Sequence, residues 1–588
     1  MQEQQQQHGA QQDPASPWRE AGEEASLLSP MGALSSPLGS AAFVRSLSST
    51  GPPRPGHADL WCARHDEAAD AEAAGEAGRR WASLAREARN LSRLALPMSV
   101  TNLAAFSIGV VVLAAAGRLG STELSCVVLG TSLFNVTGMS LLMGFTTAME
   151  TLAGQAYGAR NFKLVGTVFQ RALLLTSAMG VVVALVWTQA EPLLLFFRQD
   201  PLLARSAARY MQLTIPALFG QGVFEASKRY LLTQGVVRPQ SVVTLAGLAL
   251  APLYSWLFIF RLDWRLDGAA YAVDAIQLTM AALLGLYCVA RDAAVLRGLP
   301  HATWHGWSMD ALRGWPSYLR FALPSVAMIC CEWWTFEAMI LMSGWLEQPD
   351  LTVAVMGILV NTSGIIWMFV TGFALACSTR VSNSLGAGCP RTARRATWVA
   401  VGIAIGLELA AMGAMLALCN KWALLFTDSA EVRSLTAQLL PIFALSLPGD
   451  GANAILQGLL RGSGRQETGA VTNLCSYWLL GIPAAAYFAF RRHLGIAGLW
   501  WGLVLVNTVQ GSVMAVIALR FDFENEARKA VARTTAGDAS IAGGSSADGL
   551  AEPLLMQGPQ CERLEQGILL AEPAEASPQD LLAPSGCS

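Results

Sequence analysis

The chain has 588 residues, of which 53% are hydrophobic and only 14% are charged. So few charges over this length exclude an ordinary soluble enzyme and indicate a polytopic membrane protein. The net charge of -2, without a basic stripe interleaved with aromatic residues, argues against a nucleic-acid-binding protein.

The two ends of the chain differ in composition from its middle. Residues 1–88 are rich in Gln, Ala, Gly, Ser, Pro and Glu, and residues 521–588 resemble them. We expect both segments to be disordered tails. The N-terminus lacks the charged start, apolar core and cleavage site of a secretory signal peptide. The first span is therefore expected to be uncleaved.

Apolar runs of about twenty residues fill the middle of the chain, which is the length a helix needs to cross about 30 Å of hydrocarbon. Twelve runs predict an all-α polytopic membrane protein with both termini on one side. Loops after the even-numbered spans carry more arginine and lysine, so these loops and both tails are expected in the cytosol. The predicted spans are 94–116, 124–148, 165–187, 206–226, 239–260, 268–290, 319–344, 351–376, 397–418, 435–457, 469–490 and 496–519.

The two halves of the chain repeat each other. LALPMSVTN around Pro97 parallels FALPSVAMI around Pro324, and GFTTAMETLAGQAYGA from Gly144 parallels GFALACSTRVSNSLGA from Gly372. Six spans repeated as six give copies of parallel topology, with the substrate site of a transporter between two lobes. The predicted domains are an N-lobe at 89–290, a linker at 291–318 and a C-lobe at 319–520.

Two carboxylates lie within the seventh predicted span, in the stretch MICCEWWTFEAMIL. A charged side chain near the bilayer centre costs about 3 kcal/mol on insertion scales, so it usually faces a bundle interior and functions there. Glu332 lies near mid-span, and Glu337 lies about 140° further around the helix. The two acids are therefore predicted to face different surroundings.

A third acid, Asp450, lies in LPGDGANAILQGLLRGSG, where Pro448 and the flanking glycines loosen the predicted helix. Pro324 likewise permits a bend in the span that holds Glu332. Burial favours a protonated carboxyl, and a nearby cation favours an ionised one. Proton and cation are therefore expected to compete at Glu332 and Asp450.

Structural roles are the alternatives for the other polar residues in the spans. Glu337 could bond a neighbouring helix, and Trp333 at mid-span is more often a packing residue than a platform for a cation. Glu225 precedes two basic residues by one turn, which favours an ion pair. Glu408 and Asp274 have no helix breaker or partner in their immediate sequence, and we expect structural roles for both.

Catalytic and nucleotide-binding motifs are missing from the chain. It contains no GxxxxGK[ST], HExxH, DDxxD or GxSxG pattern. We therefore expect neither an ATP-driven pump in one chain nor an enzyme. No cofactor or metal is expected; the driving force would be a proton gradient.

The chain resembles a eukaryotic member, of the plant and algal type, of the multidrug and toxic compound extrusion (MATE) family over roughly residues 90–520. The matching motifs are CEWWTFE from Cys331, GFALACSTRVSNSLGAG from Gly372, LAGQAYGA from Leu152 and LLRGSGRQETGAVTN from Leu459. The resemblance implies two six-helix lobes in a V and the exchange of organic substrates for protons. We expect a monomer in the lipid bilayer.

The same resemblance implies roles for individual residues. Glu332 matches the essential carboxylate of the family's seventh helix, Glu337 its second acid, and Asp450 the acidic position of the tenth helix. Asn361 stands where the animal branch has a further glutamate. Val112 stands where bacterial members have an aspartate in the first helix. Proton coupling is therefore expected in the second lobe.

Other functions and locations stay open. A lipid-linked sugar flippase of the same superfamily would be expected to carry more buried basic charge. An embedded enzyme or receptor would not accumulate a substrate across the membrane of vesicles. Acids in the site favour organic cations, while similar proteins also move flavonoid conjugates, hormones and organic acids. Acidic dileucine patterns at 23–28 and 565–570 favour a vacuolar over a plasma membrane.

Overall fold

The computed structural model of the chain describes residues 75–196, 200–295 and 302–541. Every regular element in these residues is helical, and all of them fall within one compact unit. The predicted all-α fold is therefore confirmed for this part of the chain. The disorder predicted for residues 1–74 and 542–588 lies outside the described residues.

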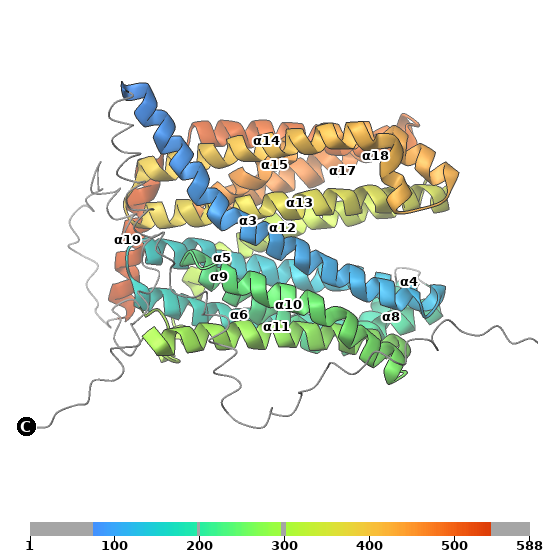
Figure 1. Ribbon diagram of the computed structural model, residues 1–588, viewed down its shortest axis with the longest axis horizontal. Coiled ribbons are helices and arrows are strands. Elements are labelled where there is room, and N and C mark those ends of the chain that lie inside the picture. Colours follow the sequence, from blue (N-terminus) through green and yellow to red (C-terminus); the bar gives the residue numbers. More distant parts are fainter. Residues whose placement is uncertain (1–74, 197–199, 296–301, 542–588) are drawn as a thin grey trace, which may run out of the picture. The chain divides into compact units, whose positions relative to one another are not determined.

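The first half of the chain forms one group of helices (Figure 1). Helices α4, η1 and α5 are continuous and together make one long helix, as do α10 and η2. The elements are α3 (Gly75–Gly117), α4 (Ser121–Phe134), η1 (Asn135–Met139), α5 (Ser140–Gly158), α6 (Phe162–Trp187), α7 (Ala190–Phe196), α8 (Pro201–Leu213), α9 (Ile215–Thr233), α10 (Arg238–Ser255), η2 (Trp256–Arg261) and α11 (Arg265–Val295).

The second half forms a similar group and ends in an additional helix. Its elements are η3 (Met309–Leu312), α12 (Trp315–Ser343), α13 (Pro349–Gly386), α14 (Pro390–Trp422), η4 (Ala423–Leu425), α15 (Ala430–Ser463), α16 (Gln466–Asn473), η5 (Leu474–Gly481), α17 (Ile482–Ala486), η6 (Tyr487–Arg491), α18 (Gly495–Leu519) and α19 (Phe523–Ile541).

Ten helices of the described residues are long and apolar enough to cross a membrane. The other two of the twelve predicted spans are real but less regular. The fourth is formed by α9, whose second half carries charged residues, and the eleventh is divided among α16, η5, α17 and η6. With these two, each half holds six crossing segments, as the repeat predicts.

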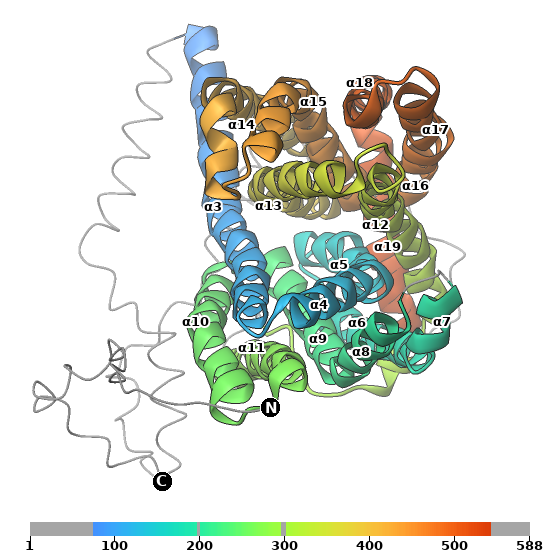
Figure 2. The same cartoon turned by 90° about the vertical axis from the view of Figure 1, so that its right-hand side faces the viewer.

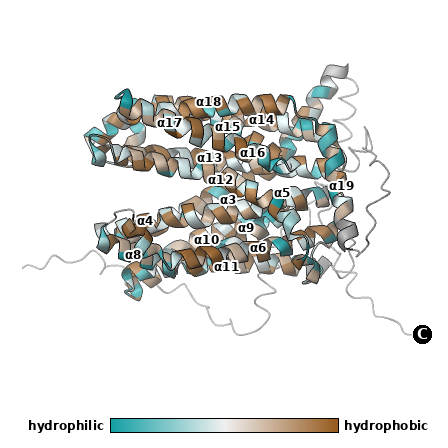
Figure 3. Cartoon of the chain, turned by 180° about the vertical axis from the view of Figure 1, so that it is seen from behind, coloured by the Kyte–Doolittle hydropathy of each residue, from teal (hydrophilic) through white to brown (hydrophobic). Residues whose placement is uncertain are grey.

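The outer surface of the helices suits lipid. Hydrophobic residues cover the middle of the helices, and hydrophilic residues gather at helix ends (Figure 3). Leu245 on α10 and Leu278 on α11 are each 45% exposed. Large apolar side chains exposed at the middle of a span indicate contact with hydrocarbon rather than water.

The first helix of each half packs against the other half (Figure 2). Helix α3 contacts α10 of its own half and α13 of the second, while α12 contacts α16 of its own half and α5 of the first. The Ser99 hydroxyl on α3 donates a hydrogen bond of 2.6 Å to the Phe369 carbonyl on α13. The two halves are thus joined along α3 and α12.

Two predicted domain boundaries differ from the structure. Helix α3 begins at Gly75, so residues 75–88 are part of a helix rather than a tail. Phe523–Ile541 forms α19, which packs against α13, α14 and α5. Its buried face consists mostly of small residues, which raise the hydropathy of the segment very little. The buried residues are Phe523, Glu526, Ala527, Ala530 and Thr534.

Candidate functional site

Glu332 lies in the interior of the second half. Its helix, α12, runs through Pro324 without a break, and the residue is only 8% exposed. The Gln457 side-chain amide on α15 donates a hydrogen bond of 3.2 Å to the carboxyl group. The predicted position of this acid inside the bundle is therefore confirmed.

Gln457 is the first member of a chain of buried amides. The Asn473 amide on α16 donates to the Gln457 side-chain oxygen at 3.5 Å and to the Met328 carbonyl at 2.9 Å. Gln510 on α18 donates to the Asn473 side-chain oxygen at 2.7 Å. Each amide fixes the orientation of the next, so three further helices of the second half, α15, α16 and α18, are connected to Glu332.

Two more carboxyl groups belong to this site. Asp450 on α15 is half-buried and lies within electrostatic range of both Glu332 and Glu408. Glu408 on α14 is 1% exposed and neither of its carboxyl oxygens has a hydrogen-bond partner in the described part of the chain. Its side chain packs against Gly451, where any Cβ would overlap it.

This arrangement determines what the site can bind. Negative charges in a low-dielectric interior repel one another, so the three carboxyls favour a bound proton or a cationic ligand. No group of three or more His, Cys, Asp and Glu side chains with the geometry of a metal site is found among residues 75–196, 200–295 and 302–541.

The other three predicted site residues make contacts outside this group. Glu337 accepts a hydrogen bond of 3.0 Å from Ser132 on α4, so it contacts the first half of the chain. Asn361 is exposed, and its amide donates to the Gly357 carbonyl of its own helix at 2.8 Å. The Trp333 ring packs edge-to-face on Trp367 with a centroid distance of 6.1 Å.

The two first-half acids singled out in the sequence, Asp274 and Glu225, have structural partners. Asp274 accepts a hydrogen bond of 2.8 Å from the Ala217 backbone amide in the first turn of α9, a donor that has no partner within the helix. Glu225 forms ion pairs with Lys228, at 2.6 Å, and with Arg229. The structural interpretations of Asp274 and Glu225 are therefore supported by their contacts.

The buried amides of Gln457, Asn473 and Gln510 were not among the predicted site residues. One signal for them exists in the sequence, since an amide inside an apolar span needs a partner on another helix. However, several other spans also contain amides. Which of them meet is decided by how the helices pack, and a single sequence does not contain that information.

The repeated glycine motifs pack against each other where α5 ends. A Cβ on Gly154 would overlap the Ser382 side chain, and one on Gly158 or Gly386 would overlap the backbone of the opposite helix. The Asn383 amide also donates to the Thr233 carbonyl at 3.1 Å. The two halves are therefore in close backbone contact at this end.

A buried ion pair joins the halves at the same end. Glu150 on α5, 1% exposed, lies 3.3 Å from Arg229 of the first half and 3.3 Å from Arg461 of the second. The Gln155 amide donates to the Gly462 carbonyl at 3.1 Å. Since charged groups in a buried site need their partners, opening this end requires the Arg461 contact to be replaced.

Comparison with known proteins agrees with this architecture. A model of the family described as MatE matches residues 97–257 and 324–487, two segments that start 227 residues apart. The chain belongs to the MatE family. Because the MATE model matches both halves, it also confirms the internal repeat.

Relatives of this MATE protein match most of its length. Protein DETOXIFICATION 16 from Arabidopsis thaliana is 35% identical over 451 residues, which are 77% of this chain and 92% of the relative. Multidrug and toxin extrusion protein 1 from Homo sapiens is 33% identical over 451 residues, 77% of this chain and 78% of the relative.

A solved structure supports the fold of this MATE protein. The crystal structure of the eukaryotic MATE transporter AtDTX14 has a TM-score of 0.73 at 30% identity and covers 77% of this chain and 99% of that one. The chain is thus a multi-pass membrane transporter of the multidrug and toxin extrusion family, and not an enzyme.

Proposed function

We propose that this transporter exports organic substrates in exchange for protons, with Glu332 and Asp450 as the proton-binding groups. The observation that supports this most directly is the burial of Glu332 beside Gln457, within electrostatic range of Asp450. Protons and cations compete for two carboxyl groups in one buried polar site, and an exchange mechanism needs this competition.

The proposed cycle alternates between two charge states of the site. In the outward-facing state, protons bind to Glu332 and Asp450 and remove the negative charge that attracts the substrate. Protonation also weakens the hydrogen bond from Gln457, because a charge-assisted bond is the stronger one. Helix α12 then bends near Pro324 or repacks, and the substrate leaves. Loss of the protons to the cytosol restores affinity.

The closed end of the molecule is consistent with an outward-facing state. Contacts at Gly154, Gly158 and Gly386 join the halves where α5 and α13 end, beside the loops that carry most of the basic residues. The positive-inside rule assigns that end to the cytosol. We propose that both termini are cytosolic and that the protein works as a monomer.

The substrate and the membrane are proposed from charge and sequence. The carboxyls favour organic cations, although secondary metabolites without a positive charge are also carried by proteins of similar sequence. The dileucine patterns at 23–28 and 565–570 lie outside the described residues and support the vacuolar membrane over the plasma membrane.

Uptake of ethidium into inside-acid proteoliposomes tests the proposal. The wild type is compared with Glu332→Gln, with Asp450→Asn and with the control Glu337→Gln, which alters an acid on the same helix that bonds Ser132. We expect gradient-dependent uptake in the wild type and at least tenfold less in the first two variants. A protonophore should abolish uptake in the wild type and in the control.

Two results would contradict the proposal. Full proton-driven uptake in Glu332→Gln would remove that residue from the coupling site. Uptake by the wild type that is unaffected when the gradient is collapsed would exclude proton exchange. If the wild type takes up no organic cation but moves a lipid-linked sugar between leaflets, the flippase is the correct function.

A further inference from the structure

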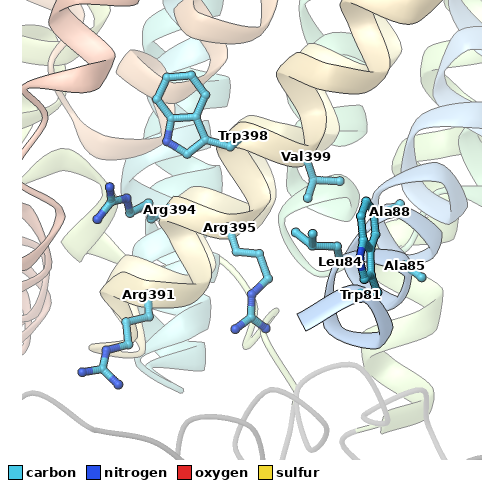
Figure 4. Close-up of a pocket in the computed structure, with 9 residues that line it drawn as sticks. All are labelled: Trp81, Leu84, Ala85, Ala88, Arg391, Arg394, Arg395, Trp398 and Val399. Carbon is cyan, nitrogen blue, oxygen red and sulfur yellow. The ribbon is translucent and has the colours of Figure 1, made fainter. Parts of the chain in front are cut away.

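A groove lies between the start of α3 and the start of α14 (Figure 4). Its volume is about 680 Å³. Trp81, Leu84, Ala85 and Ala88 line it from α3, at the spacing of one helix face, and Trp398 and Val399 line it from α14 together with three arginines. The groove is separate from the carboxyl site and plays no part in the proposed function.

The charge of the groove comes from Arg391, Arg394 and Arg395, in the first two turns of α14. Among the described residues no hydrogen bond or ion pair is formed by any of the three. Arg391 and Arg394 are exposed, and Arg395 is half-buried. The amino end of α14 adds a partial positive charge of its own. The groove therefore attracts an anion.

The groove also has an apolar part. Trp81 is 72% exposed and Leu84 39% exposed, so both present apolar surface that the protein does not cover. In Figure 4 the Arg391 and Arg395 guanidinium groups lie at one end of the groove, and Trp398 and Val399 lie further along α14. A ligand that fits both parts has an anionic end and an apolar end.

The position of the groove matches a membrane–water boundary. The helices that hold two candidate spans, Arg80–Gly117 and Pro390–Leu425, both begin there, ahead of the apolar runs at 94–116 and 397–418. Tryptophan is enriched at this depth of a bilayer, and basic residues next to a span interact with anionic lipids. The molecules available at that depth are phospholipids, whose phosphate lies at the level of the arginines and whose acyl chains extend towards the bilayer centre.

The walls of the groove are held in place by a buried ion pair. Arg380 on α13 donates two hydrogen bonds, of 2.9 and 2.8 Å, to the Glu87 carboxylate on α3. Glu87 lies one residue before Ala88 of the groove lining, and α13 packs against α14. The groove is therefore formed before a ligand arrives, which lowers the entropic cost of binding.

We propose that this groove binds the phosphate headgroup of an anionic phospholipid, with the three arginines around the phosphate and the tryptophans against the upper acyl chains. Such a lipid fills the space between α3 and α14 and joins the two halves of the transporter at the end where they meet.

Native mass spectrometry of the full chain tests the proposal. The protein is delipidated in detergent and titrated with phosphatidylinositol 4-phosphate, with phosphatidylcholine and with inositol 1,4-bisphosphate, which has no acyl chains. The test variant is Arg391→Gln/Arg394→Gln/Arg395→Gln. The control is Arg261→Gln/Arg491→Gln/Arg492→Gln, which removes three exposed arginines at the ends of η2 and η6.

We expect the wild type and the control to bind the anionic lipid, and the test variant to bind it at least tenfold more weakly. Phosphatidylcholine and the soluble headgroup should bind weakly to all three proteins. A photoactivatable analogue with a diazirine in its acyl chain should cross-link to the peptides that contain Trp81 or Trp398. Unchanged thermal unfolding of the delipidated variants shows that they are folded.

Three results would overturn the proposal. Equal losses in the test and control variants would mean general attraction to charge. Binding of the soluble headgroup as tight as that of the lipid would make the groove a phosphate site. If the lipid binds only after Asp66, Glu67, Asp70 and Glu72 are neutralised, the groove is occupied by the chain's own acidic segment.

Discussion

At the scale of single residues, the direction in which a side chain points from its helix determines its contacts more than its depth in the membrane does. Glu332 and Glu337 are five positions apart on α12, yet the first bonds Gln457 of the second half and the second accepts from Ser132 of the first half. A rotation of about 140° around the helix separates two different roles. The first acid is the one we propose for exchange of protons, and the second contacts the other half.

Glu408 provides a test in which stability and transport should change in opposite directions. The Glu408 carboxyl is buried and has no hydrogen-bond partner among the described residues, so an apolar side chain of similar size removes a desolvation penalty. We expect Glu408→Met to stabilise the protein by about 1–3 kcal/mol. Proton-driven uptake should fall, because Asp450 loses its neighbouring acid.

Thermal unfolding, monitored by tryptophan fluorescence, measures the change in stability. The proteoliposome assay measures the change in uptake. Glu408→Gln, which keeps the shape of the side chain and loses the charge, is the matched control and should show a smaller gain in stability. A lower unfolding temperature together with unchanged uptake in Glu408→Met would contradict this account.

The sequence indicated which acids lie inside the bundle and did not indicate which side chains surround them. Glu332 and Asp450 were found because an acid in an apolar run is conspicuous and costly. Glu408 has the same signal, but its importance depends on its packing against Gly451, which sequence alone does not reveal. Asn361 was selected by resemblance, and the structure places it on an exposed part of α13.

At the scale of elements, α5 and α13 make contact through glycines rather than large side chains. A missing Cβ lets two backbones approach closely, which is common where membrane helices cross. The same motif occurs in both repeats. Each helix therefore supplies a glycine that leaves space and a backbone group that packs against the glycine of the other helix. The contact is self-complementary, and it opens without separating large interdigitated side chains.

A methyl group at this contact should favour opening. In Gly158→Ala the new Cβ overlaps the Asn383 carbonyl, whereas Gly402 on α14 has no atom within 4 Å of its would-be Cβ. We expect Gly158→Ala to destabilise the closed end by about 1–3 kcal/mol. Gly402→Ala should be neutral or slightly stabilising.

Hydrogen–deuterium exchange of residues 150–158 and 378–386 measures this effect. Exchange should rise in Gly158→Ala and remain at the wild-type level in Gly402→Ala, while uptake falls only in the first variant. Equal exchange in the two variants would show that this contact does not hold the end closed.

Helix α19 shows why some elements are invisible in the sequence. Its buried positions, from Phe523 through Ala527 and Ala530, have helical spacing. They are mostly small, and the exposed positions between them are charged, so the segment has the composition of a tail. Arg533 donates to Gln155 of the first half at 2.8 Å and to the Ser463 carbonyl of the second at 3.3 Å. These contacts of α19 with both halves are visible only in the packed structure.

At the scale of the whole molecule, the Glu87–Arg380 pair connects the two halves, with both side chains 6% exposed. We expect Glu87→Ala to destabilise the protein by about 3–5 kcal/mol, because Arg380 stays buried without that carboxylate. Glu87→Leu/Arg380→Met should recover most of the loss, since neither side chain of the pair then carries a buried charge.

Thermal unfolding of the two variants in the same lipid mixture provides the measurement. The double variant should unfold within a few degrees of the wild type, and the single variant at a clearly lower temperature. A double variant that is no more stable than the single one would show that the charges themselves are needed in this environment.

The first helix of each half packs against the other half, and this packing has a consequence for biosynthesis. The Ser99 hydroxyl and the Phe369 carbonyl that it contacts are 270 residues apart. At roughly 5–20 residues per second, a ribosome needs roughly fifteen to fifty seconds to reach α13 after it has made α3. Until α13 is made, α3 has contacts with its own half, such as those with α10, and none with the second half. Quality control at the insertion site therefore meets a half-built transporter whose first helix still lacks its contacts with the second half.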